Sequence, residues 1–180
     1  MKQKFILFIC FLTAMALIPV FGLRTGAGKS EKPNGSKEDD RIYKIIASVC
    51  NNEYSDKTLR AVARIVYNNI SLGYTYKDCD CSDKELLEKV KSVCSKKPAD
   101  IIIDGKQRYI PFSSCSNGNT KADGKYPYLT SVASPWDSFS SEYTDSAACV
   151  GVSIDGLDYL CENGFSSDQA LKWYLPGMKG

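Results

Sequence analysis

One carboxylate, Glu53, has a setting that suits proton-transfer chemistry. It lies between two segments with apolar residues at helical spacing, after the polar pair Asn51-Asn52 and directly before Tyr54. An aromatic neighbour that excludes water raises the pKa of a carboxylic acid, which then serves as a general acid near neutral pH. The alternative interpretation of Glu53 is a solvated loop carboxylate or a helix-cap partner.

Several other kinds of site are excluded by composition. The sequence contains no histidine, which rules out Ser–His and Cys–His catalysis and every metal site that needs an imidazole. An all-cysteine or cysteine–carboxylate zinc site stays open, but the pair Cys79-x-Cys81 is spaced more closely than usual zinc-binding pairs. Disulfides or free thiols explain the cysteines more simply, so we expect no metal and no other cofactor.

Seven cysteines follow the N-terminal apolar segment. In an exported domain they are available for disulfides, so we expect at least one pair within bonding reach. An odd number leaves at least one thiol free or bonded to another chain. The seven that follow the N-terminal apolar segment are Cys50, Cys79, Cys81, Cys94, Cys115, Cys149 and Cys161.

The N-terminus predicts export. Lys2 and Lys4 precede an unbroken apolar run over residues 5–22, so residues 1–22 are either a signal peptide or an N-terminal membrane anchor. Either interpretation places Leu23 onward outside the cytoplasm. The remaining 21 Lys and Arg balance 21 Asp and Glu, so the exported part has no electrostatic footprint for nucleic acid.

Composition and periodicity divide the rest of the chain. Residues 23–40 are rich in Gly, Pro, Ser and charge, which predicts a flexible linker. Three amphipathic helices follow in the first part of a domain over residues 41–180. They are predicted over 41–51, from a Ser55-Asp56 cap to Gly73, and from a Ser82-x-x-Glu85 capping box to a stop before Pro98.

The second half of the domain mixes strands and helices. Residues 101–112 predict a β-hairpin around Asp104-Gly105, and 126–132 predict a further strand. A helix is expected over 153–162, and a last short helix opens at a Ser166-x-x-Gln169 box. The sequence therefore predicts a single small α+β domain, with amphipathic helices packed on a small antiparallel sheet.

Four segments carry motifs that occur in this order in one known family. They are VCNNE with LRA at 49–53 and 59–61, FSSCSNGNT at 112–120, YPYLTSVASPWD at 126–137, and VGVS with ALKWYLPG at 150–153 and 170–177. Through them the chain resembles the SpoIID/LytB family, named for stage II sporulation protein D. The YPYL…SPWD segment is the most specific match.

The resemblance implies a role in the bacterial cell wall. It implies a peptidoglycan lytic transglycosylase, in which Glu53 is the general acid/base and glycan strands are the substrate. The runner-up is a non-catalytic peptidoglycan-binding or amidase-enhancing module that acts with a wall amidase. A third interpretation is a disulfide-stabilised envelope protein with no glycan role.

Residues 113–125 are mostly Ser, Asn, Gly and Thr and are expected to form a polar loop. The resemblance also implies a sugar-binding cleft along this polar loop. Its substrate-binding candidates are Ser113, Ser114, Ser116, Asn117, Asn119 and Tyr128. A solvated loop, and core packing for Tyr128 and Trp136, are the alternatives. Asp137 either supports the acid or caps a turn. The family's His and Gln are replaced here by Ala148 and Ile154, so the zinc site of some members, with one His and two Cys, is not carried over.

Overall fold

The computed structural model describes residues 37–77 and 81–179, which belong to one compact unit, Gly35–Gly180. Within these ranges the chain forms a small α+β domain with five α-helices and two two-stranded sheets, and this confirms the predicted fold class. The segment 1–22, most of the linker 23–40 and Cys79 lie outside the described residues. No helix in the described ranges is long and apolar enough to span a membrane.

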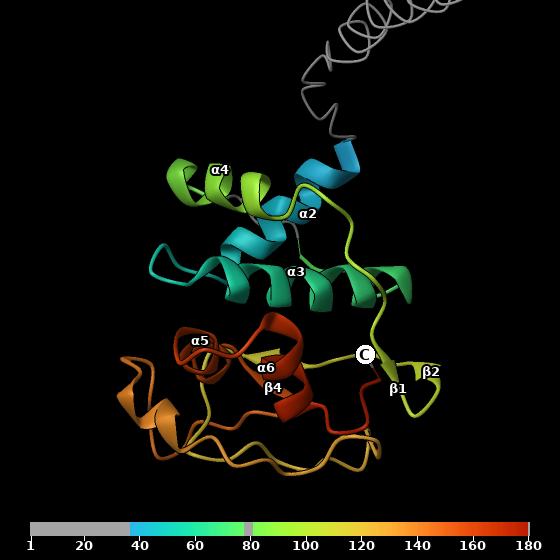
Figure 1. Ribbon diagram of the computed structural model, residues 1–180, viewed down its shortest axis with the longest axis vertical. Coiled ribbons are helices and arrows are strands. Elements are labelled where there is room, and N and C mark those ends of the chain that lie inside the picture. The colour runs from blue at the N-terminus through green and yellow to red at the C-terminus, as the bar shows by residue number, and fades with distance from the viewer. Residues whose placement is uncertain (1–36, 78–80, 180) are drawn as a thin grey trace, which may run out of the picture. The chain divides into compact units, whose positions relative to one another are not determined.

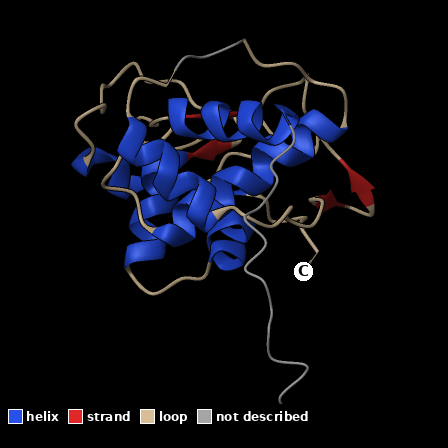
Figure 2. Ribbon diagram, turned by 90° about the horizontal axis from the view of Figure 1, so that it is seen from above, coloured by secondary structure: helices blue, strands red, loops and turns tan. Residues whose placement is uncertain are grey.

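The helices form layers around a central one. In Figure 1, α3 lies between α2 and α4 on one side and α5 and α6 on the other, and α3 contacts all four. Most of the regular structure is helical, and the strands are short (Figure 2). The helices span α2 Lys37–Ser48, α3 Asp56–Ser71, α4 Lys84–Val93, α5 Ile154–Glu162 and α6 Ser167–Tyr174.

Helix α3 is apolar on two faces, and each face fills a separate part of the core. Leu59, Val62 and Val66 pack towards α2 and α4. Ala61 and Ile65 pack towards α5 and α6. Burying each large aliphatic side chain stabilises the fold by about 1.5–3 kcal/mol. Both halves of the domain, and the residues at their junction, are therefore fixed against one helix.

Helix ends follow local capping chemistry, with two corrections to the sequence-based boundaries. Helix α2 begins at Lys37, four residues earlier than expected, because Glu38, Asp39 and Asp40 suit the positive end of the helix dipole. Helix α4 is capped by Asp83, whose side chain accepts from Leu86 N at 2.9 Å, and not by Ser82.

The predicted caps of α3 and α6 are confirmed. Ser55 caps α3 through its side chain, and Ser153, which the sequence predicts as the first residue of a helix, caps α5 in the same way. Ser166 and Gln169 form the expected capping box at α6.

The hairpin is present but short. Strands β1 (Ile102–Ile103) and β2 (Lys106–Gln107) are antiparallel, and the turn between them has positive φ at Asp104 (50°) and Gly105 (76°), as a tight hairpin turn requires. The C-terminus lies beside this hairpin (Figure 1), where Asp104 N donates to Gly177 O at 3.2 Å.

The second strand pair differs from the expected antiparallel sheet. Strand β3 (Phe112–Ser113) runs parallel to β4 (Val152–Ser153). Gly151, at φ 84°, permits this approach, because a Cβ there would overlap the carbonyl of Pro111. The strand predicted over 126–132 is wrong: the segment forms turns, with Leu129 N donating to Tyr126 O at 2.9 Å, and Pro127 has no N–H to donate.

Two buried asparagines at the end of α3 tie the hairpin segment to the helices. Asn69 donates from Nδ2 to Ile110 O at 2.8 Å and accepts from Ile110 N at 2.9 Å. Asn68 accepts from Ile101 N at 3.0 Å and donates to Arg108 O at 2.7 Å. These amides replace a longer sheet by satisfying the backbone of residues 101–110.

Candidate functional site

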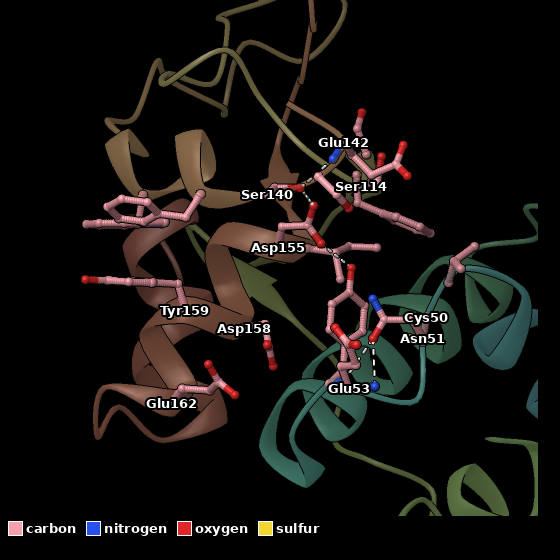
Figure 3. A pocket seen from close by; sticks show the side chains of 18 of the residues that line it. Cys50, Asn51, Glu53, Ser114, Ser140, Glu142, Asp155, Asp158, Tyr159 and Glu162 are labelled. Atoms are coloured by element: carbon pink, nitrogen blue, oxygen red, sulfur yellow. Dashed lines mark hydrogen bonds between the residues drawn. The ribbon is translucent and has the colours of Figure 1, made fainter. Parts of the chain in front are cut away.

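A cavity of about 710 Å³ opens beside Glu53. Its walls come from the loop after α2, from β3, from the 3₁₀ helix η1 (Pro135–Phe139) with the loop that follows, and from α5. Figure 3 shows Glu53 on one side of this cavity and the acidic residues of α5 on the other. Segments far apart in the sequence therefore build one concave surface.

Glu53 is held by its backbone and is free at its carboxylate. The side chain of Asn51 accepts from Glu53 N at 2.9 Å and from Tyr54 N at 3.0 Å, which fixes the turn after α2. Glu53 is exposed, and its carboxylate has no hydrogen bond or ion pair to any residue that the structure describes. The group is therefore available to a ligand.

A second cavity, of about 630 Å³, lies on the other side of Glu53, between the loop after α2 and the start of α4. The two cavities share four lining residues, Ser48, Cys50, Asn51 and Glu53. Glu53 therefore lines both cavities.

Asp155 is a carboxylate of the larger cavity that hydrogen bonds hold in position. The hydroxyls of Tyr54 and Ser140 each donate to it, and its own N–H donates to Ser114 O at 2.9 Å. It lies in the first turn of α5, where the helix dipole stabilises a negative charge. Burial, together with the hydrogen bond to Asp155, raises the pKa of Tyr54, so its hydroxyl stays protonated and donates.

The lining of this cavity is acidic. Asp158 accepts from Ser55 N at 3.0 Å and from the Thr58 hydroxyl, and so joins α5 to the start of α3. Five carboxyl side chains line the cavity, and no Lys or Arg does. They are Glu53, Glu142, Asp155, Asp158 and Glu162. Such a surface repels phosphates and accepts hydrogen bonds from hydroxyl and amide donors.

Two of the predicted loop residues lie at this cavity. Ser113, in β3, and Ser114 both line it together with Glu53. Ser114 is exposed, so its hydroxyl is accessible to a ligand.

The other loop candidates and Tyr128 do not line either of these cavities. Ser116 is fully buried. Its N–H donates to the Asp137 carboxylate at 2.8 Å, and its hydroxyl donates to the same oxygen. Asn117 donates to Asp145 O at 3.1 Å, and Asn119 bridges to Ala133. These interactions shape the loop and turn it away from Glu53.

Three aromatic or acidic residues of the YPYL…SPWD segment have separate positions. The Tyr128 hydroxyl donates to Tyr109 O at 2.7 Å, and its ring packs near Arg108, away from the larger cavity. Trp136 does line that cavity. Asp137 is fully buried and anchors the polar loop through Ser116, so it neither contacts Glu53 nor lines the cavity.

Several cavity residues were not among the sequence-based candidates, namely Ser140, Glu142, Asp155, Asp158 and Glu162. A signal for three of them was present: Asp155, Asp158 and Glu162 recur at positions that share one face of the helix predicted over 153–162. No sequence signal linked that face to Glu53, since the two are about a hundred residues apart in the chain.

No disulfide joins two of the described cysteines. Cys50, Cys81, Cys94, Cys115, Cys149 and Cys161 are all free. Burial raises the pKa of Cys94 and of Cys149 to about 11. The described ranges hold no cluster of three metal-binding side chains. Because Cys79 lies outside these ranges, a disulfide in the chain stays a prediction.

Comparison of the chain with protein-family models and with curated protein sequences found no match.

Proposed function

We propose that this chain cleaves the glycan strands of peptidoglycan as a lytic transglycosylase, with Glu53 as the general acid/base. The observation that carries the proposal is the position of Glu53, an accessible carboxylate that lines two cavities, one of which also contains the hydrogen-bonded Asp155. The resemblance to the SpoIID/LytB family supports the choice of substrate.

Glu53 would act twice in the reaction. As an acid it protonates the glycosidic oxygen, the bond from this oxygen to the muramic anomeric carbon breaks, and an oxocarbenium-like centre forms. As a base it then takes the proton from the muramic C6 hydroxyl, which bonds to the anomeric carbon and closes a 1,6-anhydro ring. The proton is conserved and no water is consumed, so one acid suffices.

The fixed carboxylate of Asp155 complements this chemistry. Positive charge develops on the sugar ring in the transition state, and a preorganised negative group nearby stabilises that charge. Tyr54 and Ser140 hold Asp155 in one orientation through its two oxygens. Ser114 supplies an accessible hydroxyl for the sugar.

Substrate binding would enclose Glu53. Glu53 is exposed in the free chain. A glycan that fills both cavities removes water from around this carboxyl. The proposed substrate also requires an extracytoplasmic location, in agreement with the interpretation of residues 5–22.

The test compares wild type with Glu53→Gln on purified peptide-free glycan strands. The full-length proteins are incubated with strands, and new 1,6-anhydro ends are measured by mass spectrometry. Loss of general acid/base help lowers a rate by about 10²–10⁴-fold, so Glu53→Gln should release none at a detectable level. Glu162→Gln is the matched control: it changes another carboxyl of the same cavity and should retain cleavage. Equal release by wild type and Glu53→Gln contradicts the proposal.

The runner-up function is a glycan-binding or amidase-enhancing module without turnover. The exposure of Glu53 in the free chain favours it, because nothing in the described residues desolvates this carboxyl before substrate binds. It predicts retention of wild type and Glu53→Gln on purified sacculi with no new ends from either. Stimulation of a wall amidase would then be the activity to measure.

A further inference from the structure

A stack of three aromatic rings forms one end of the larger cavity. Trp136 and Tyr159 lie parallel, with ring centroids 5.5 Å apart and an interplanar angle of 5°. Phe139 covers Tyr159, with centroids 6.0 Å apart and an angle of 27°. All three line the cavity, and we refer to them as the aromatic shelf.

The outermost ring of the aromatic shelf is unusually exposed. Phe139 is 78% exposed, the highest value among the large exposed apolar side chains of the described residues. Burying a phenylalanine is worth about 1.5–3 kcal/mol, so a ring left in water beside a cavity gains that energy only when something covers it. Tyr159 is also partly exposed, at 37%.

The aromatic shelf is preorganised. The Trp136 indole N–H donates to the Tyr174 hydroxyl at 3.2 Å, which ties the innermost ring to α6. Pro135 opens η1, which carries Trp136 and Phe139, and Tyr159 projects from α5 and stacks with both rings. Because these rings are fixed before a ligand arrives, little conformational entropy is lost on binding.

The surroundings of the aromatic shelf select the occupant. A pyranose ring has an apolar face of C–H groups and an edge of hydroxyl donors. The shelf offers a flat apolar surface for the face, and Asp158 and Glu142 offer acceptors for the hydroxyls. A lipid chain would bring no hydrogen-bond donor to these carboxylates, and a phosphate would be repelled by them.

We propose that the aromatic shelf is a carbohydrate subsite, where one sugar ring of the glycan strand stacks on the exposed ring of Phe139. The proposal rests on the proposed function for the identity of the glycan. In the view of Figure 3, Asp158 lies between Glu53 and the Tyr159 ring, so the shelf lies away from the cleavage point. It holds the strand in register while Glu53 acts on another glycosidic bond.

The experiment measures binding without turnover. Soluble peptide-free glycan oligosaccharides are titrated into full-length Glu53→Gln protein by calorimetry, alone and combined with Phe139→Ala or Phe139→Trp. Phe139→Ala should weaken binding about five- to tenfold, the effect of one lost ring contact, and Phe139→Trp should restore it. Thermal unfolding should be unchanged, because Phe139 is exposed.

Tyr74→Ala is the matched control. Tyr74 is another exposed ring, at 45%, and stacks on Tyr109 with centroids 4.0 Å apart, but it lines neither cavity. It should leave glycan affinity unchanged. Equal affinity with and without Phe139→Ala, or an equal loss in Tyr74→Ala, overturns the subsite.

Failure of this subsite is distinguishable from failure of the proposed function. If wild type releases anhydro ends and Phe139→Ala leaves KM and kcat unchanged, the subsite is wrong and the function stands. If binding depends on Phe139 but wild type releases no ends, the subsite stands and catalysis is wrong. If the Glu53→Gln parent does not bind the oligosaccharides at all, the subsite is wrong.

Discussion

Removing the Tyr54 hydroxyl tests how the cavity is held together. Tyr54 is buried, at 7% exposure, and its hydroxyl donates to one oxygen of Asp155. A hydrogen bond to a charged group contributes about 1.5–3 kcal/mol. Asp155 keeps the Ser140 hydroxyl and faces an open cavity, where water replaces the lost donor, so the lower end applies. We expect Tyr54→Phe to reduce the free energy of unfolding by about 1.5 kcal/mol.

A double-mutant cycle isolates this hydrogen bond from the other effects of each substitution. Urea denaturation of wild type, Tyr54→Phe, Asp155→Ala and the double variant gives the four free energies. Tyr54 and Asp155 contact each other directly, so a coupling energy of about 1 kcal/mol or more is expected.

Additive effects of the two substitutions would show that the Tyr54 hydroxyl and the Asp155 carboxylate contribute to stability independently, and would exclude a stabilising hydrogen bond between them. The cleavage rate provides a second readout. Tyr54 directly follows Glu53 in the chain, so loosening its ring should also lower the rate of strand cleavage without changing the reaction product.

Two further predictions concern the fold that positions the site. Asn69→Ala should reduce the free energy of unfolding by about 2–4 kcal/mol, because both the N–H and the carbonyl of Ile110 lose their partner. The control is Asn117→Ala, which loses one exposed hydrogen bond and should change the free energy of unfolding, measured by urea titration, by less than about 0.5 kcal/mol. Similar losses of stability in the two variants would contradict this role of Asn69. Stability should also fall as the pH rises from about 9 towards 11: the pKa values of Cys94 and Cys149 are raised by burial from 9.0 to about 11, so these thiols ionise first in the unfolded chain. Thermal melts of wild type against Cys94→Ala should show a smaller alkaline loss in the variant, and equal losses would exclude the thiol as a cause.

The sequence predicted best what depends on neighbouring residues. The Ser55 cap of α3 and the capping box at α6 are set within a single helical turn, and both are present. The turn at Asp104-Gly105 is equally local, since only two residues need positive φ. The grouping of Glu53 with Ser113 and Ser114 around one cavity is the part of the predicted site that the structure brings together.

The parts that sequence reasoning missed depend on contacts between distant segments. The parallel pairing of β3 with β4 joins residues about forty positions apart, and it requires Gly151 to pass close to Pro111. In the sequence Ser116 resembles an accessible loop hydroxyl, but in the structure it is buried and hydrogen-bonded to Asp137, 21 residues along the chain. Asp155 reaches the cavity only because α5 packs against α3. None of these contacts has a local signal in a single sequence.

In the proposed reaction, Glu53 promotes an internal attack by the sugar's own C6 hydroxyl. Full-length wild type and Glu53→Gln can be incubated with peptide-free glycan strands in heavy-oxygen water, and the mass of the new ends then shows whether water took part. We expect 1,6-anhydro ends without heavy oxygen from wild type, because no water enters the bond, and no new ends from Glu53→Gln. New reducing ends that carry heavy oxygen, or anhydro ends formed equally by both proteins, would contradict the proposed reaction.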